Sequence, residues 1–223
     1  MRIIEQKKRK NLKKENKKLK EKKEKLEQIK YAIPYGIPII SSDSSQQYYN
    51  VSDVGIDKKK LTWKSGIQYP TISFSPALDI GIYSTEVEFG GNGDSGIGIV
   101  RDSYTINSEE NPYSGTNCQH MATFGGYSYS GGAGCINYKG AQNSGNTSYS
   151  GNQTVKLEYD SGKGTLILFI NGTQQPVFVS GIREKVRFIL SLYNSCGNCT
   201  IKSLKKLSAQ TSVQMSNGKA VQW

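Results

Sequence analysis

Two groups of residues in this 223-residue chain have types and spacings that could support chemistry. The first is Gly162-Lys163-Gly164-Thr165, which looks like part of a phosphate-binding loop. Such a loop needs the spacing G-x-x-x-x-G-K-[ST] between a strand and a helix, so that backbone N–H groups surround the phosphates. Here the earlier glycine is missing, a glycine follows the lysine, and a strand pattern comes next. We therefore predict a tight turn between two strands at residues 160–164.

The second group is a candidate zinc site. Cys196 and Cys199 have the C-x2-C spacing with which two thiolates can hold one zinc ion, and Cys118 and His120 would complete a tetrahedral set. The alternative is that the residues between the two cysteines simply form the turn of a hairpin, with free thiols beside it. Because the other two residues are far away in the sequence, we expect no metal and no cofactor.

Residues for acid–base or nucleophilic catalysis are scarce. The single histidine, His120, lies two residues from Cys118, and this spacing alone does not indicate a nucleophile and its base. Glu86 and Glu88 share one face of a predicted strand, but we expect an inward-facing Glu86 to be a buried, hydrogen-bonded structural group. The sequence therefore predicts a protein that is not an enzyme.

Basic residues are concentrated at the N-terminus, where residues 1–30 contain 14 Lys/Arg and 5 Asp/Glu. Residues 3–30 are rich in helix-forming residues, and Leu12, Leu19 and Leu26 recur every seven positions. This pattern predicts a basic helical arm, either solvated or forming a coiled coil through which the chain could dimerise. An electrostatic role is a third alternative, as a nuclear-import signal or as a patch for RNA or an acidic membrane. On this third alternative, the arm is the one part of the chain that would bind nucleic acid.

The helical pattern stops at the sequence PYGIP, which begins at Pro34. The Ser/Gln-rich stretch after it predicts a linker over residues 31–50, followed by a domain at 51–207 and a polar tail at 208–223. No run of 18 apolar residues occurs, which predicts no membrane span. The first residues lack the apolar segment of a secretory signal, so we expect an intracellular protein, cytoplasmic or nuclear, with reduced thiols.

The domain itself is a succession of short strand patterns. In TVKLEY, for example, Val155, Leu157 and Tyr159 face one way, while Lys156 and Glu158 face the other. The predicted strands are 60–65, 71–75, 82–89, 96–101, 122–126, 135–139, 154–159, 164–170, 176–180, 186–192 and 199–204. Because no helical window separates them, they predict an all-β fold, an antiparallel β-sandwich or barrel with the helical arm at its N-terminus.

Several of these segments resemble the SPRY (B30.2-like) family. In VKLEYDSGKGTLILFINGT (155–173), a strand ending near an Asp turns into a "gtL-x-F-x-x-NG" strand, and the matching residues are Asp160, Gly164, Thr165, Leu166, Phe169, Asn171 and Gly172. LTWKSG, GIYSTEVEF, GIGIVRD and FILSLYNSCGNCTIKSL occur in the family's order, so the resemblance covers about residues 50–205. It implies a SPRY or concanavalin-like jelly-roll sandwich. Ser84-Thr85 replaces the family's usual Trp, and residues 103–150 are longer than the pattern requires.

The resemblance implies a module that binds through its loops. Tyrosines on Gly/Ser-rich loops are typical of adaptable recognition surfaces, so we expect a protein or peptide partner, although some of these tyrosines should pack on the sheet instead. Arg101 and Asp102 are expected to follow their strand at the end of the sandwich where these tyrosine-bearing loops lie. The candidate partner-binding residues are Arg101, Asp102, Tyr104, Tyr113, Tyr127, Tyr129 and Tyr149. A lectin-like, carbohydrate-binding module is the alternative, because related sandwiches host lectins.

Overall fold

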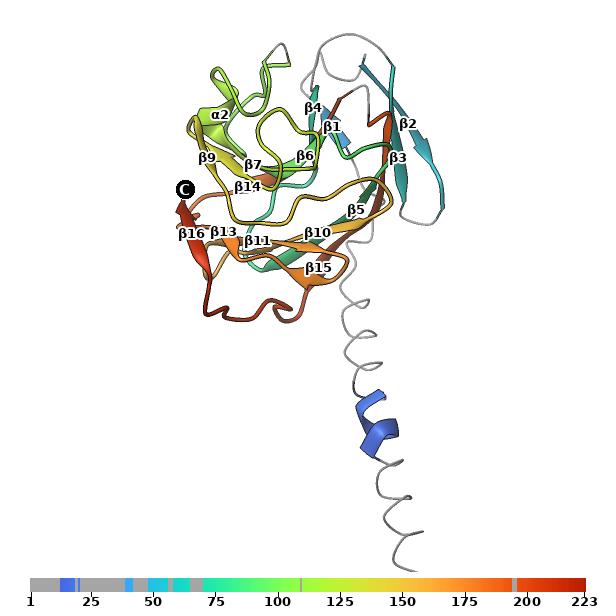
Figure 1. The fold of residues 1–223 in the computed structure, drawn as a ribbon, viewed down its shortest axis with the longest axis vertical. Coiled ribbons are helices and arrows are strands. Elements are labelled where there is room, and N and C mark those ends of the chain that lie inside the picture. The colour runs from blue at the N-terminus through green and yellow to red at the C-terminus, as the bar shows by residue number, and fades with distance from the viewer. Residues whose placement is uncertain are drawn as a thin grey trace, which may run out of the picture.

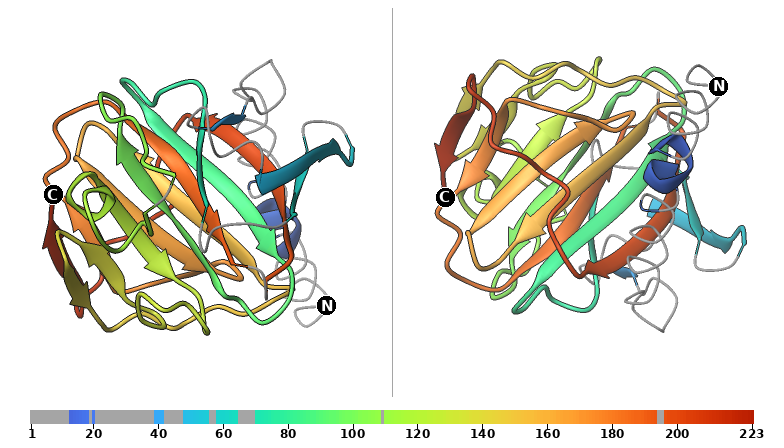
Figure 2. Two further views of the ribbon diagram at one scale, coloured as in Figure 1. Left: turned by 90° about the horizontal axis from the view of Figure 1, so that it is seen from above. Right: turned by 90° about the horizontal axis from the view of Figure 1, so that it is seen from below.

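The computed structural model describes residues 13–18, 20, 39–41, 48–55, 58–64, 70–108, 110–193 and 196–223. Within these ranges the chain forms two β-sheets that face each other (Figure 1). The strands of both layers run in roughly the same direction, as expected for an aligned sandwich (Figure 2). The all-β sandwich predicted from the sequence is confirmed.

Seven of the described strands form the first sheet. In spatial order they are β1 (Ile39–Ser41), β4 (Thr71–Phe74), β14 (Val186–Leu192), β6 (Ser95–Arg101), β7 (Met121–Gly125), β8 (Ile136–Tyr138) and β9 (Ala141–Asn143). A four-residue helix, α2 (Asn117–His120), comes directly before β7. All neighbouring strands of this sheet are antiparallel.

The second sheet contains nine of the described strands. Eight lie in the order β16 (Lys219–Gln222), β13 (Val177–Ser180), β11 (Thr165–Ile170), β10 (Thr154–Asp160), β5 (Ile82–Phe89), β15 (Asn198–Leu207), β3 (Lys59–Trp63) and β2 (Tyr49–Asp53), while β12 (Thr173–Gln174) pairs with β11. The pairing of β16 with β13 is parallel. The turn between β10 and β11 lies where the Gly-Lys-Gly segment predicted it, with Asp160 accepting hydrogen bonds from Gly162 N (2.9 Å) and Lys163 N (3.1 Å).

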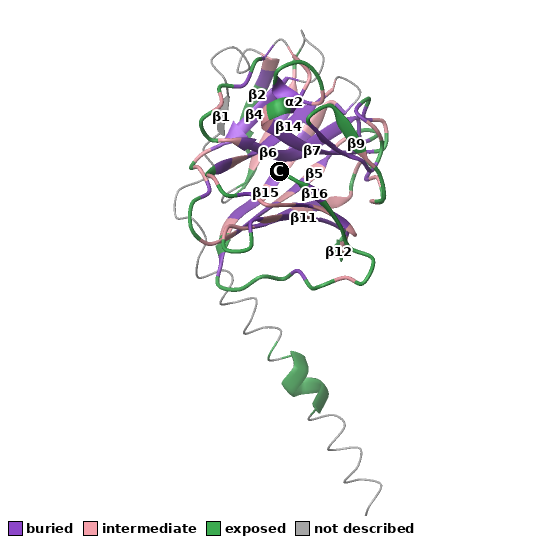
Figure 3. Cartoon of the chain, turned by 90° about the vertical axis from the view of Figure 1, so that its left-hand side faces the viewer, coloured by how far each residue is buried: buried purple, intermediate pink, exposed green. Residues whose placement is uncertain are grey.

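The core lies between the sheets and follows the alternation seen in the sequence (Figure 3). Val155, Leu157 and Tyr159 of β10 are all at most 2% exposed and face the first sheet. Burying β-branched, aromatic and leucine side chains in this way contributes about 25 cal/mol per Å² of apolar surface. The sandwich therefore depends on residues whose spacing is visible in the sequence.

The C-terminal segment 208–223, expected to be a polar tail, packs on the sandwich. It crosses the outer face of the second sheet (dark red in Figure 1) and then adds β16 to its edge. At the other boundary, β1 lies in the segment expected to be a linker, and β2 begins at Tyr49. β1 has only three residues, too few for an alternation to show, and in β2 only Tyr49 is buried, so neither has the buried face from which the other strands were predicted.

The described part of the basic arm, residues 13–18 and 20, is helical and exposed. The rest of the predicted helix 3–30, with its coiled-coil and dimer predictions, lies outside the described residues. In the part of the chain that the structure describes, no helix is both long enough and apolar enough to cross a membrane.

Candidate functional site

Four connecting segments meet at one end of the sandwich, which we call the loop end: residues 90–94, 126–134, 144–153 and, of the fourth, 193 and 196–197. They meet because β6 begins beside the end of β7, with Gly96 opposite Gly125. Backbone hydrogen bonds join them directly, from Tyr127 N to Tyr149 O (2.7 Å) and from Tyr193 N to Asp94 O (3.0 Å). The loop end is thus one connected surface.

Glycines allow these segments to approach so closely. Gly93 has a φ of +78°, and a Cβ added there would lie 2.5 Å from the carbonyl oxygen of Tyr149. A Cβ on Gly126 would collide with the carbonyl oxygen of Gly93. A backbone held by direct contacts of this kind is pre-organised, which lowers the entropy lost when a partner binds.

Tyr149, predicted to contact a partner, is instead a core residue. Its side chain is 0% exposed and stacks on Phe89, with ring centroids 5.2 Å apart. Its hydroxyl donates to the carbonyl oxygens of Ser95 and Phe124, each 3.1 Å away. Burial raises its pKa well above the usual value of a tyrosine. The ring therefore supports the loop end from below, and no partner can reach it.

Tyr129 and Tyr113 hold the long 126–134 loop against the outer face of the first sheet. Tyr129 is 3% exposed and lies against Gly96 and Gly125, while the half-buried Tyr113 meets it edge-on at 5.1 Å. The prediction that Tyr129 faces a partner is therefore wrong: glycines on two adjacent strands leave a trough in the sheet that its ring fills.

Tyr104 belongs to a small cluster on the same outer face. It packs against Val100, Ile106, Met121 and Ile189 and stacks on His120 at 4.1 Å. Its hydroxyl donates to the side-chain oxygen of Asn117 at 3.0 Å. The ring thus fixes the 102–120 connection to the sheet, well away from the loop end.

Tyr127 is the tyrosine of the predicted set that the loop end presents to solvent, with 67% of its surface exposed. The half-buried Tyr193, which was not among the candidates, lies at the same end, after β14. Asp94 is the only charged residue in the four loop-end segments, and it is 6% exposed. The four segments therefore expose no charged side chain and consist mostly of Gly, Ser, Tyr and Asn.

Arg101 and Asp102 lie at the opposite end of the sandwich, contrary to expectation, because β6 runs away from the loop end. Arg101 pairs with Glu184, lies 5.0 Å from the ring of Trp223 and donates to the Tyr138 hydroxyl at 3.2 Å. Asp102 pairs with Arg187 at 3.2 Å. Both side chains serve to close this end of the sandwich.

Replacing Arg101 by lysine should lower the free energy of unfolding by roughly 1 kcal/mol. Lysine keeps the charge but cannot keep both the Glu184 contact and the flat contact with Trp223. Urea denaturation measures this effect. Unchanged stability together with weakened partner binding would return Arg101 to the partner-binding surface.

The four residues of the candidate zinc set do not come together. Cys118 and His120 are in α2 on the outer face of the first sheet, whereas Cys196 lies in a loop-end segment and Cys199 near the start of β15. Burial raises the pKa of Cys196 to about 12, and that of Cys199 also rises. Across the described ranges, no three His, Cys, Asp or Glu side chains are grouped closely enough to hold a metal ion.

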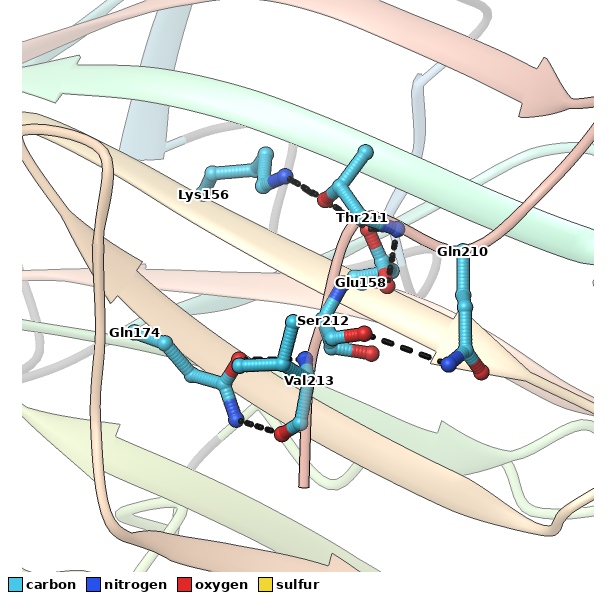
Figure 4. A network of polar contacts seen from close by, with 7 residues as sticks. All are labelled: Lys156, Glu158, Gln174, Gln210, Thr211, Ser212 and Val213. Carbon is cyan, nitrogen blue, oxygen red and sulfur yellow. Dashed lines mark hydrogen bonds and ion pairs between the residues drawn. The ribbon is translucent and has the colours of Figure 1, made fainter. Parts of the chain in front are cut away.

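A buried carboxylate is present, but it is Glu158 of β10 rather than Glu86, which is half-buried on the outer face. Glu158 is 1% exposed and accepts hydrogen bonds from Thr211 N and Ser212 N, each at 3.0 Å (Figure 4). Burial by itself would raise its pKa, but the hydrogen bonds from Thr211 and Ser212, aided by Lys156, lower it. Glu158 thus anchors the C-terminal segment to the sheet.

Comparison with known proteins supports the fold. No protein-family model matches the sequence, and no curated protein matches it. Among solved structures, the TRIM65 PSpry domain aligns with a TM-score of 0.55 and 11% identity, over 76% of this chain and 92% of that one. The SPRY domain of human HERC1 aligns with a TM-score of 0.50 and 14% identity, over 68% and 90%. A carbohydrate-binding module of Bacillus subtilis, CBM66, reaches only 0.43, with 11% identity over 76% and 95%. The chain has a SPRY-like fold.

Proposed function

We propose that this protein is a non-catalytic interaction module that binds a peptide or protein epitope at its loop end. The observation that carries the proposal is the exposed ring of Tyr127 on a backbone fixed by interlocked loops. An exposed tyrosine gives a large contact area at a low entropy cost, and neighbouring Ser and Asn side chains supply hydrogen bonds. The fold also supports this function. The chain has a SPRY-like fold, and its resemblance to the SPRY family implies a module that binds through its loops.

The chemistry of the loop end favours binding over catalysis. Apart from its tyrosines, the titratable side chains in these four segments are those of Asp94 and Cys196, and both are buried. The raised pKa of Cys196 keeps it a thiol at neutral pH, whereas a nucleophile needs the thiolate. A general acid or base must reach the surface where a substrate binds, and the buried carboxylate of Asp94 does not.

Replacing Tyr127 by alanine should weaken partner binding about tenfold or more, while the free energy of unfolding changes by less than about 0.5 kcal/mol. The ring is 67% exposed, so its removal leaves no cavity. The test is a pull-down from cell lysate with the full chain and the variant, with Kd measured for each captured protein. Because the loop-end segments expose no charged side chain, binding should persist at roughly 0.5 M salt.

Val213→Ser, a change at an equally exposed residue (67%) of the C-terminal segment, is the matched control and should retain the partner. Loss of the captured protein at high salt, or its retention by the Tyr127 variant, would contradict the proposal. Competition by millimolar simple sugars would instead indicate the carbohydrate-binding alternative.

The basic arm has its own proposed roles, oligomerisation or localisation. Its described residues are exposed and include Lys13, Lys14, Lys17, Lys18 and Lys20. A dimeric arm would raise the apparent affinity for a repeated target. Sedimentation of the full chain and of a chain lacking residues 1–30 distinguishes a dimer from a monomer, and RNA binding by the arm would decline steeply with salt.

A further inference from the structure

The end of the sandwich opposite the loop end contains a pocket of about 260 Å³. Three connections surround it: residues 75–81, 161–164 and 181–185. They are tied together by hydrogen bonds from Leu78 N to Val186 O (2.7 Å), from Ile182 N to Gly164 O (3.1 Å) and from Gly81 N to Ser161 Oγ (2.8 Å). These hydrogen bonds fix the three connections relative to one another, so the pocket has a defined shape.

The floor of the pocket is apolar. Leu78, Tyr159 and Ile182 contribute to it from the core, and each is at most 2% exposed. At the rim, Ile80 is 81% exposed, a large apolar side chain without cover. Small-molecule sites usually enclose roughly 300–1,000 Å³, so this smaller hollow suits one apolar side chain of a peptide better than a whole small molecule.

Two acidic and two basic side chains line the pocket, and among them Arg183 is the one without an ion pair to another described residue. Lys185 pairs with Asp79 at 3.1 Å, and Glu184 is occupied by Arg101 and by Trp223 Nε1, which donates to it at 2.8 Å. Arg183 also lines the pocket and is exposed, and it has no ion pair within the ranges that the structure describes. Its guanidinium is thus free to pair with a carboxylate from outside, for which its geometry is well suited.

We propose that this pocket is a second binding site, which takes an acidic segment of a protein partner. One apolar side chain would enter over Leu78, Tyr159 and Ile182 and contact Ile80, while a flanking carboxylate pairs with Arg183. The site is independent of the loop end, because the two lie at opposite ends of the strands. It also differs in chemistry: binding here weakens with added salt, whereas binding at the uncharged loop end does not.

The probe is the capped pentapeptide Gly-Glu-Leu-Glu-Gly, titrated into the ¹⁵N-labelled full chain while backbone amide shifts are followed. Shifts are expected at residues 79–81 and 182–185, and not at Tyr127. Arg183→Gln should weaken binding about fivefold. Replacing leucine by alanine in the peptide, or Ile80 by serine in the protein, should also weaken it. Arg183 and Ile80 are exposed, so both variants should fold normally.

A charge exchange gives the sharpest comparison. Arg183→Glu should bind Gly-Lys-Leu-Lys-Gly better than the acidic peptide, reversing the order seen for the original chain. Tyr127→Ala should leave the titration unchanged. The proposal is overturned if the acidic peptide shifts no amides in 79–81 or 182–185, or if the original chain binds the lysine peptide equally well.

Discussion

Replacing Glu158 by glutamine is expected to lower the free energy of unfolding by roughly 2–3 kcal/mol. The buried carboxylate accepts hydrogen bonds from Thr211 N, Thr211 Oγ1 and Ser212 N and lies 3.5 Å from Lys156 Nζ. A glutamine amide has one acceptor oxygen, and its NH2 group would face these donors. Urea denaturation gives the free energy, and limited proteolysis shows whether residues 208–218 have been released from the sheet.

Glu86→Gln is the matched control, because Glu86 is on the same outer face but only half-buried. It should change the free energy of unfolding by less than about 0.5 kcal/mol. Equal losses from the two variants would show that Glu158 does not anchor the C-terminal segment.

The same carboxylate predicts a pH dependence. Its pKa in the folded protein is lowered, so the stability that it contributes is fully present above its ordinary pKa of 4.5 and is lost as the pH falls through the lower, folded value. The difference in unfolding free energy between the original chain and Glu158→Gln should therefore narrow as the pH is lowered below about 4.5. A constant difference from pH 7 to strongly acidic conditions would contradict the lowered pKa.

Replacing Tyr149 by alanine is expected to cost roughly 3–5 kcal/mol and to abolish binding at the loop end. The change removes a fully buried ring that stacks on Phe89, and the carbonyls of Ser95 and Phe124 lose their donor. The cavity lies directly beneath the loops joined by the bond from Tyr127 N to Tyr149 O. Denaturation and partner titration are measured on the same samples.

Tyr149→Phe separates the ring from its hydroxyl. It should cost only about 1–2 kcal/mol, because Ser95 O still accepts from Gly126 N at 2.9 Å and the aromatic contact persists. Partner binding should remain within about threefold of the original. If the phenylalanine variant were as damaging as the alanine variant, the hydroxyl rather than the ring would organise the loop end.

The strands were predictable from the sequence because their signal is local. In β10 the alternation of Val155, Leu157 and Tyr159 with polar residues indicates which side is buried, and the structure agrees. Glu158 shows the limit of this signal. It alternates correctly onto the outer face, but its burial depends on Thr211 and Ser212, more than 50 positions later in the chain. No pattern within a strand predicts that a later segment of the chain will cover its outer face.

The candidate site could be predicted only in part, for a similar reason. Gly/Ser-rich segments correctly indicated loops, but whether a tyrosine there is buried depends on other strands, as with Tyr129 against Gly96. The position of Arg101 was available to sequence reasoning. When two consecutive strands pair antiparallel, the end of the first lies beside the start of the second. Arg101 ends β6 and Tyr127 follows the end of β7, so the two residues lie at opposite ends of the sheet.

The glycine contacts of the loop end have a consequence for how this surface can change. Backbone-to-backbone contacts at Gly93 and Gly126 set the shape of the loops, so that shape does not depend on the exposed side chains of Asn92, Tyr127 and Thr147. With the proposed function, substitutions at these three positions would alter which partner is recognised without refolding the surface. Binding specificity could diversify there, by natural drift or in a randomised library, while both glycines stay invariant.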